Sequence, residues 1–333
     1  MSSFTFPICT ILSFLLHFHI SRLIAPTNIY IYKYNIITGR RDLPVNNSQT
    51  DQMAKQLDLL PHDCISHILS FGSPPDACRS AAVSSAIRSA ADSDAVWERF
   101  LPADYPTILS RLVLPPPSSS KKHLFLALCN PLLIDDGTKS FSLERATRKI
   151  CYRLSARELA ITWAANPLYW AWKCHFHSRF AEVAELRTVW WLEIIGKINT
   201  RMLSPNTKYG AYLIVQFANH AYGLDSLPSE VSLQVGNYKS QGTIYLRPQK
   251  CKKHSLEQVY YSNRIGVLRS RVSTSGEERS PKDREDGWVE IELGEFYNGG
   301  ERDEEVNMSL KEIKGVHLKG GLVVEGIEIR PKE

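Results

Sequence analysis

Tryptophan residues gather in one short stretch of the chain, ITWAANPLYWAWK, which contains Trp163, Trp170 and Trp172. Asn166-Pro167 interrupts regular structure between the first two, so the rings are expected on and around a loop. An aromatic ring can stack on the apolar face of a sugar while nearby polar groups bind its hydroxyls. The same rings could equally pack into a core, and spacing alone leaves both interpretations open.

Other combinations of reactive side chains have simpler explanations. The run Cys174-His175-Phe176-His177 brings a thiol and two imidazoles together, but no second ligand pair follows at zinc-finger spacing. We therefore expect a solvated loop there and no metal. The sequence also contains no nucleophile elbow, zinc-protease motif or phosphate-binding loop. We expect no cofactor and no catalytic residue.

Composition is that of a soluble globular chain with about two domains. Of 333 residues, 43% are apolar and 23% charged, and the net charge of +5 is too small to indicate nucleic-acid binding. Seven cysteines are scattered without any C-x-x-C pair. This usage favours reduced thiols in a cytosolic or nuclear protein.

The amino-terminal segment 1–52 begins with the apolar run FTFPICTILSFLLHFHI. No basic residue precedes this run, no small-residue cleavage site follows it, and its length is marginal for a membrane span. A signal anchor, a sticky strand and an extension outside the folded protein are all possible. We favour the extension, because Met53 opens a stretch typical of a domain start.

Residues 53–103 predict a small helical module. Ile65, Ile68 and Leu69 recur at helical spacing, and Gly72 ends that helix. A second helix is expected from Asp76, with small residues and Val83 facing inward, and a third is expected after an N-cap at Asp94. Three short helices bury little on their own, which favours a partner that covers their apolar surface. Packing onto the rest of the chain is the alternative.

The spacing of Leu60-Pro61, Ile68-Leu69 and Val96-Trp97 resembles that of an F-box. In that family the module docks on the Skp-type adaptor of a cullin–RING ubiquitin ligase. The resemblance implies adaptor contacts by the five residues Leu60, Pro61, Ile65, Ile68 and Leu69. It also implies that Trp97 supports the module from within.

Residues 104–150 are predicted to be a linker and a bridging helix. Three consecutive prolines and three serines at 115–120 are typical of a linker, and an amphipathic segment follows from Lys121. The paired acids Asp135-Asp136 lack the series of a calcium loop, so turn residues are expected.

Residues 151–333 change to two-residue periodicity. Apolar positions alternate with polar ones at Val231–Val235 and Val289–Leu293. Further strands are expected at 159–163, 189–198, 211–217, 243–246 and 306–310. Many short antiparallel strands between turns favour a jelly-roll-like β-sandwich. The fold class is therefore α+β, with a three-helix module ahead of the sandwich.

Several motifs in this half resemble the phloem protein 2 lectins, the Nictaba-related group. They are AREL with ITW at 156–163, YWAW at 169–172, FAEVAEL at 180–186, GKI at 196–198, DGWVEI at 286–291, LGEF at 293–296 and IEIRP at 327–331. With the helical module, the chain resembles a plant F-box protein of the phloem protein 2 type. The resemblance implies binding of N-acetylglucosamine oligomers or N-glycan cores. The implied carbohydrate-binding residues are Trp163, Trp170, Glu305 and Glu312, although Glu304 leaves the position of Glu305 uncertain by one.

The resulting hypothesis is a non-catalytic substrate receptor of a cullin–RING ligase, in the cytoplasm, the nucleus or both. Its partners would be a Skp-type adaptor with its cullin complex and a glycan or glycoprotein, with no nucleic acid and no membrane. One alternative is a carbohydrate-binding lectin with no ligase role. A second is a tethered or secreted lectin that uses Phe4–Ile20.

Overall fold

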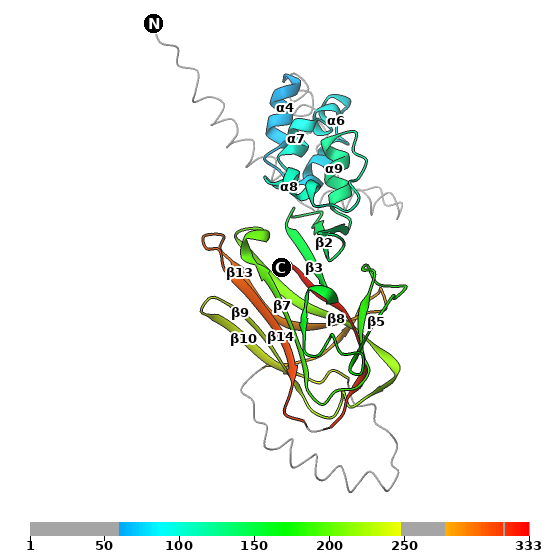
Figure 1. Ribbon diagram of the computed structural model, residues 1–333. Helices are drawn as coiled ribbons and strands as arrows, with labels where there is room; N and C mark the ends of the chain where they lie inside the picture. The colour runs from blue at the N-terminus through cyan, green and yellow to red at the C-terminus, as the bar shows by residue number, and fades with distance from the viewer. Residues whose placement is uncertain (1–59, 248–276, 316, 333) are drawn as a thin grey trace, which may run out of the picture. The chain divides into compact units, whose positions relative to one another are not determined.

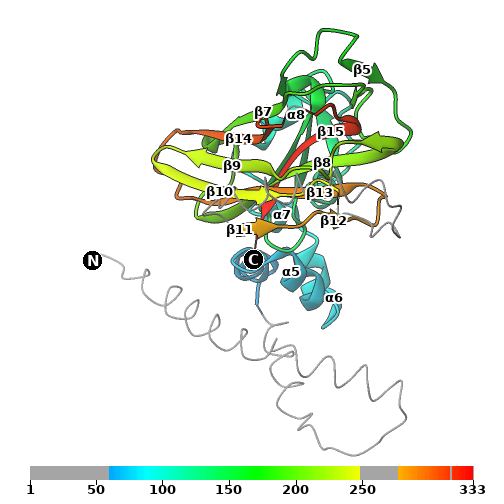
Figure 2. The same cartoon turned by 90° about the horizontal axis from the view of Figure 1, so that it is seen from below.

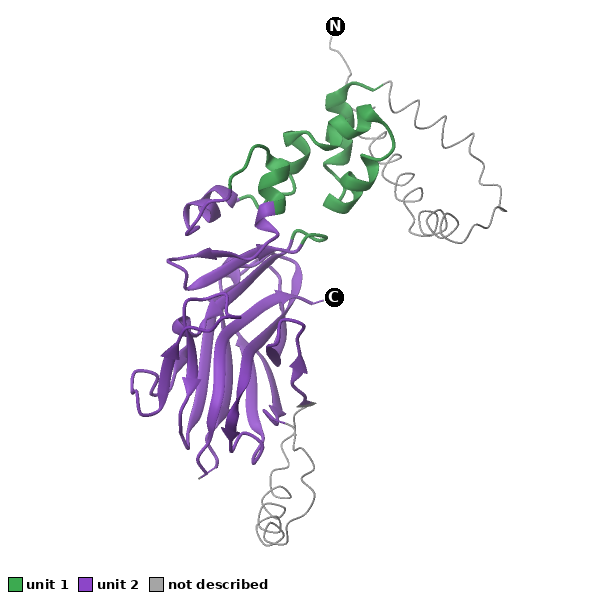
Figure 3. Ribbon diagram, turned by 90° about the vertical axis from the view of Figure 1, so that its right-hand side faces the viewer, with its two compact units in different colours: residues 1–103, 117–126, 145–148 green, residues 104–116, 127–144, 149–333 purple. Residues whose placement is uncertain are grey.

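The computed structural model describes residues 60–247, 277–315 and 317–332. The segment 1–52, with its three interpretations, lies outside these residues. The described chain divides into two compact units (Figure 3). The helical unit contains residues 60–103, 117–126 and 145–148, and the β unit contains the remaining described residues. No helix within the described ranges is both long and apolar enough to cross a membrane.

The helical unit is built from short helices with polar caps. Ser73 and Asp76 form a reciprocal capping box, and the Ser84 hydroxyl accepts a hydrogen bond from the Ile87 N–H at 3.2 Å. The helices are α4 (His62–Leu69), α5 (Pro74–Ser80), α6 (Ser85–Ala91) and α7 (Asp94–Glu98), followed by the first part of α9 (Lys121–Leu128).

Between residues 60 and 103 the structure thus describes four helices, where the sequence predicted three for the module. The missed helix is α6, whose sequence SAIRSAA has Ile87 as its single large apolar residue and therefore a weak periodic signal. The cap before α7 is Ser93, not Asp94. Val83, predicted to face inward, is exposed, because it lies in the turn between α5 and α6.

Aromatic rings form the core of the helical unit. Trp97 is buried, as predicted, and its indole N–H donates to the Ala91 carbonyl at 2.7 Å. Its ring centroid lies 5.5 Å from that of Phe100 and 5.4 Å from that of Phe125. Phe125 comes from α9, so residues beyond 103 complete this core.

The β unit is a sandwich of two sheets, as predicted (Figures 1 and 2). The larger sheet has the order β1 (Leu132–Ile134), β2 (Lys139–Leu143), β3 (Ile150–Ser155), β15 (Gly320–Pro331), β8 (Thr207–Tyr222), β13 (Val289–Asn298) and β12 (Lys282–Asp283), with β6 (Val183–Leu186) pairing β15 and β5 (Trp170–Lys173). The smaller sheet has the order β11 (Glu277–Arg279), β10 (Tyr238–Ile244), β9 (Ser229–Val235), β14 (Glu305–Glu312), β7 (Leu192–Asn199) and β4 (Ala160–Ile161). Neighbouring strands are antiparallel except for the parallel pair β10–β11.

Two glycines allow the sheets to approach closely. A Cβ added to Gly196 of β7 would lie 2.6 Å from Ile327 Cδ1 of β15. A Cβ added to Gly294 of β13 would lie 2.7 Å from Leu233 Cβ of β9. Since real Cβ atoms do not approach so closely, a larger residue at either position would require neighbouring atoms to shift.

The segment 104–150, expected to be a linker and a bridging helix, also contains β-strands. It includes α8 (Tyr105–Ser110) and α9, and its later part forms the antiparallel pair β1–β2 at the edge of the larger sheet. The turn between these strands is Asp135-Asp136-Gly137, and all three residues have positive φ. Asp135 forms ion pairs with Arg111 and Lys139 rather than a cation site.

The larger sheet contains a buried group of charges. Arg153 of β3 forms ion pairs with Glu325, at 2.6 Å, and with Glu328, both of β15. Burial would raise the pKa of Glu328, but the positive charges of Arg153 and Arg284 outweigh it and lower that pKa to about 2. The charged group therefore joins β3 to β15.

Candidate functional site

Trp163 lies on a strained turn that directly follows β4. Its φ of 61° is a left-handed conformation, which residues other than glycine rarely adopt. The turn is closed by hydrogen bonds from the Ala164 N–H to the Ile161 carbonyl and from the Asn166 N–H to the Trp163 carbonyl. Trp163 is 38% exposed. Such strain persists where the surrounding structure enforces it, often at a binding site.

Three aromatic rings from two segments meet at this turn, the loop between β4 and β5 and the residues before β7. The Trp163 ring centroid lies 5.1 Å from that of Tyr169 and 5.7 Å from that of Trp190. Trp190 is 47% exposed and Tyr169 is half-buried. We call Trp163, Tyr169 and Trp190 the Trp163 cluster. Its apolar ring surface is open to solvent and can stack against a sugar.

Trp190 was not among the predicted binding residues. The adjacent pair Trp190-Trp191 gave a signal, because neighbouring side chains near a strand point to opposite sides and one ring must face away from the core. The sequence did not show which ring that was. In the structure Trp190 is exposed and Trp191 is half-buried.

The structure places Trp170 in the core beneath the cluster rather than on its surface. Trp170 is 2% exposed, and its indole N–H donates to the Thr162 carbonyl at 3.1 Å. This bond ties the first residue of β5 to the backbone just before Trp163. Little of its ring reaches solvent, so direct sugar contact at Trp170 stays a prediction that depends on the adjoining cavity, which Trp170 helps to line.

Glu193 anchors the turn from the neighbouring strand β7. Its carboxylate accepts hydrogen bonds from Thr162 Oγ1 at 3.0 Å and Trp191 Nε1 at 3.2 Å, and it pairs with Lys311 Nζ at 2.9 Å. The hydrogen bond from Lys311 lowers the pKa of Glu193. Glu193 thus positions the residues on both sides of the cluster, a role that its sequence position did not reveal.

Glu312, one of the two predicted glutamates, reaches the cluster only indirectly. It is buried at the end of β14, pairs with Lys319 Nζ and accepts a hydrogen bond from the Gly315 N–H at 3.1 Å. Lys319 is also buried, and its Nζ donates to the Trp190 carbonyl at 2.7 Å. The Glu312–Lys319 pair therefore positions the backbone of Trp190.

Glu305, the other predicted glutamate, lies at the far end of the same strand. In the β14–β7 pairing Glu305 faces Asn199 whereas Glu312 faces Leu192. Seven residues of strand separate the two glutamates by about 23 Å. Glu305 is exposed and pairs with Lys197 at 2.9 Å, which lowers its pKa. The structure does not bring Glu305 to the Trp163 cluster.

A cavity of about 340 Å³ lies next to the cluster. Arg157, Trp172 and Arg187 line it, together with Trp170. The Arg157 guanidinium stacks over the Trp172 ring at 3.6 Å and donates two hydrogen bonds to Glu182. The cavity has the size of a small-ligand site and an aromatic lining.

The Cys174-His177 segment is largely exposed, as expected: Cys174, Phe176 and His177 reach solvent, and His175 is half-buried. The His175 ring lies 5.1 Å from the Trp288 ring, and Trp288 Nε1 donates to the His177 carbonyl at 3.1 Å. In the part of the chain that the structure describes, no group of three or more His, Cys, Asp or Glu residues could hold a metal ion.

The helical unit presents an exposed apolar surface around α4. Leu60 is 37% exposed, Pro61 is exposed, and Ile68 and Leu69 are half-buried. We call these four residues the Leu60 surface. Ile65 differs from them, because it is 4% exposed and packs against Ile87, Ala90 and Leu69 in the core. Of the five predicted adaptor contacts, Ile65 thus supports the surface from below and offers almost no area to a partner.

Two family models match this chain. Residues 149–331 match phloem protein 2, and residues 57–102 match an F-box-like family. The first match covers more than half of the chain and includes the whole Trp163 cluster. The second includes the Leu60 surface.

Proteins of Arabidopsis thaliana are similar over most of the chain. F-box protein PP2-B15 is 49% identical over 279 residues, which cover 82% of this chain and 96% of that protein. F-box protein PP2-B13 and F-box protein VBF are each 47% identical over 82% of this chain, and the matches cover 98% and 99% of their lengths. The similarity therefore spans both units.

Proposed function

This chain belongs to the phloem protein 2 family and has an F-box-like segment, and from that premise we propose that it is a substrate receptor of a cullin–RING ubiquitin ligase. The helical unit would bind the Skp-type adaptor, which in turn joins the cullin. The β unit would bind a glycan or glycoprotein carrying N-acetylglucosamine oligomers or an N-glycan core.

The observation that carries this proposal is the exposure of the Leu60 surface. Aliphatic side chains at the start of α4 remain open to solvent, and Phe71 and Val83 of the same unit are also exposed. Burial of such side chains stabilises a contact by about 25 cal/mol for each Å² removed from water. An aliphatic centre with a polar rim is the usual anatomy of a stable protein interface.

The Trp163 cluster supports the glycan half of the proposal. Trp163 and Trp190 offer ring faces for stacking, and the adjacent cavity adds Arg157 and Arg187 as hydrogen-bond donors. Glu193 and the Glu312–Lys319 pair hold the turn and Trp190 in place before a ligand arrives. Such preorganisation reduces the entropy lost on binding.

In this proposal the chain is a recognition subunit and not an enzyme. Its contribution to ubiquitin transfer would be to hold the target near a ubiquitin-conjugating enzyme supplied by other subunits. We further propose that it acts in the cytoplasm, the nucleus or both. The proposed domain boundaries remain 53–103 for the F-box and 151–333 for the lectin-like domain, with 1–52 outside the fold and 104–150 between them.

Two measurements on the full chain test the proposal. Co-purification with a Skp-type adaptor tests the receptor role, and binding of chitotriose, measured by calorimetry, tests the saccharide role. Adaptor binding without chitotriose binding would keep the receptor and reject the glycan site. Chitotriose binding without adaptor binding would favour a lectin with no ligase role.

A further inference from the structure

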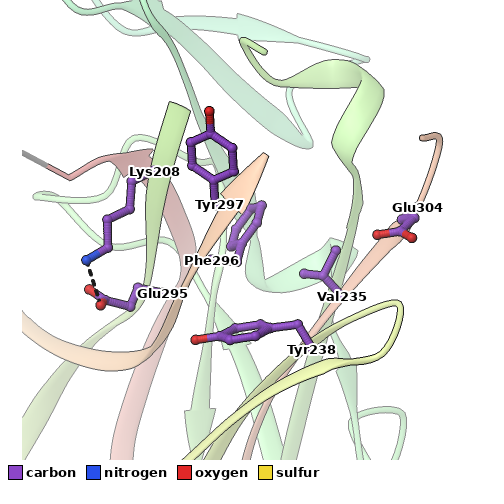
Figure 4. A pocket seen from close by; sticks show the side chains of 7 residues that line it. All are labelled: Lys208, Val235, Tyr238, Glu295, Phe296, Tyr297 and Glu304. Atoms are coloured by element: carbon purple, nitrogen blue, oxygen red, sulfur yellow. Dashed lines mark ion pairs between the residues drawn. The ribbon is translucent and has the colours of Figure 1, made fainter. Parts of the chain in front are cut away.

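A second pocket lies at the other end of β14 from the Trp163 cluster. It has a volume of about 360 Å³ and lies where the β9–β10 hairpin of one sheet faces β8 and β13 of the other (Figure 4). Tyr238 and Tyr297 are 51% and 64% exposed, and the buried side chains of Phe296 and Val235 lie beneath them. Large exposed rings around a cavity indicate a contact site. We call this the Tyr238 pocket.

One charged pair on its wall is already satisfied. Lys208 Nζ and Glu295 lie 2.8 Å apart, and Lys332 Nζ contacts the same carboxylate at 2.8 Å. Hydrogen bonds from Lys208 and Lys332 lower the pKa of Glu295. Figure 4 shows this pair on one side of the pocket and Glu304 on the other. The Glu295 carboxylate is therefore ionised, and Lys208 and Lys332 balance its charge, which leaves it little capacity to bind a ligand.

Glu304 is different, because the residue is half-buried and its carboxylate is unpaired. Among the described residues, none donates a hydrogen bond to this carboxylate or forms an ion pair with it, while its backbone N–H is fixed by Thr200 Oγ1 at 3.0 Å. The carboxylate lies against the hairpin turn, where a Cβ on Gly236 would be 2.7 Å from Glu304 Oε1. Gly236 also has a φ of 50°. Glycine therefore suits this position because it leaves room for the carboxylate and adopts this φ readily.

We propose that the Tyr238 pocket binds the positively charged side chain of an arginine or lysine in an extended peptide segment of a partner protein. A cation above a tyrosine ring is attracted by the negative face of the ring. Its aliphatic stem would cover Phe296 and Val235, and its charge would meet Glu304. An arginine fits best, since its planar guanidinium can stack on a ring and donate to a carboxylate together.

Charge is the reason to prefer a basic peptide over a saccharide here. A neutral sugar could stack on Tyr238, but it would leave the unpaired carboxylate of Glu304 without a counter-charge. This inference does not rest on glycan binding, because the Tyr238 pocket and the Trp163 cluster share no residue.

The test uses three capped peptides and the full chain labelled with 3-fluorotyrosine. The peptides are Ac-Gly-Arg-Gly-NH2, its lysine counterpart and its citrulline counterpart, which has the shape of arginine without the charge. Tyr238→Phe and Tyr297→Phe each remove one fluorine signal and so identify the signals of these two tyrosines among those of the labelled chain. We expect the arginine peptide to shift both signals saturably, the lysine peptide to shift them less and the citrulline peptide to leave them in place.

Variants then assign the interaction to its residues. Glu304→Gln keeps the shape of the side chain and should weaken binding of the arginine peptide about fivefold, while Tyr238→Leu should weaken it by a similar factor. Glu301→Gln, a nearby exposed carboxylate outside the pocket, is the matched control and should change nothing. Near-ultraviolet circular dichroism checks that each variant is folded.

Four results would overturn the proposal. They are equal binding of the arginine and citrulline peptides, unchanged binding in Glu304→Gln, displacement of the arginine peptide by chitotriose, and no saturable shift with any peptide. Displacement by chitotriose would make the Tyr238 pocket a saccharide site instead.

Discussion

The ring of Trp163 lies 5.7 Å from the ring of Trp190, although one follows β4 and the other precedes β7. The antiparallel pairing of β4 with β7 places Ile161 opposite Ile194 and so brings the two segments together. Glu193 then bonds Thr162 on one side and Trp191 on the other. The exposed aromatic surface is therefore a product of strand pairing, and this gives the first prediction.

Replacing Trp163 or Trp190 with alanine should weaken chitotriose binding about tenfold, since a stacking contact of about 1.4 kcal/mol is lost. Both side chains are substantially exposed, so the melting temperature should change little. Isothermal titration calorimetry of the full chain measures the affinity. Tyr297→Ala removes an exposed ring of the Tyr238 pocket and serves as the control. Equal losses in all three variants would show that the Trp163 cluster is not the saccharide site.

Trp170→Ala should behave differently and destabilise the β unit by about 3–5 kcal/mol, because it leaves a large cavity in a well-packed region. Trp170→Phe, which keeps most of the ring but loses the hydrogen bond to the Thr162 carbonyl, should cost less. Urea denaturation followed by circular dichroism gives the free energy of unfolding. A Trp170→Ala protein with unchanged stability and weak chitotriose binding would make Trp170 a contact residue after all.

Combining Leu60→Ala with Pro61→Ala should abolish co-purification with a Skp-type adaptor, because the two exposed apolar side chains at the start of α4 are removed together. The helical unit should remain folded, since neither side chain is in its core. Leu114→Ala is the matched control, because Leu114 is an exposed leucine of the β unit. Undiminished adaptor capture by the double variant would refute the assignment of the Leu60 surface.

Ile65→Ala should lower the free energy of unfolding of the helical unit by about 2–5 kcal/mol, because Ile65 packs in the core against Ile87 and Ala90. Any loss of adaptor binding should then result from unfolding of the helical unit and not from a lost contact with the adaptor. Thermal circular dichroism and adaptor capture, measured on the same preparation at a temperature where the variant is folded, separate the two effects. Weak adaptor capture by a variant with normal stability would return Ile65 to the list of contacts.

Acid should destabilise the β unit through Glu328. Its folded pKa of about 2 lies below the ordinary value of 4.5, so its stabilising effect is complete above about pH 4.5. That stabilisation, about 3 kcal/mol for this difference in pKa, is lost as the pH falls from 4.5 towards 2.

Urea midpoints measured between pH 7 and pH 2 test this dependence. Glu328→Gln should lower stability at pH 7 and flatten the decline in acid, because it leaves Arg153 with one buried partner instead of two. Glu301→Gln, which alters an exposed carboxylate, should follow the wild-type curve. A Glu328→Gln protein with an undiminished acid transition would assign that transition to other groups.

Several features could be predicted from the sequence because they depend on local pattern. Alternation at Val231–Val235 and Val289–Leu293 predicted strands that became β9 and β13, since side chains of a strand alternate between faces. The same rule places Glu305 and Glu312, seven positions apart in β14, on opposite faces, although the motif resemblance implied that both bind the carbohydrate. Helix α6 was not predicted, because a segment made mostly of serine and alanine has little hydrophobic periodicity.

What the tertiary structure alone decided is which side chains reach solvent and which meet. Trp163 and Trp170 share one local pattern, yet one is exposed on a turn with positive φ and the other is buried under it. Ile65 and Leu60 likewise share an apolar character and differ in burial. The burial of a side chain and its contacts with other side chains depend on pairings between distant segments, such as β4 with β7. No periodicity within a segment encodes these pairings.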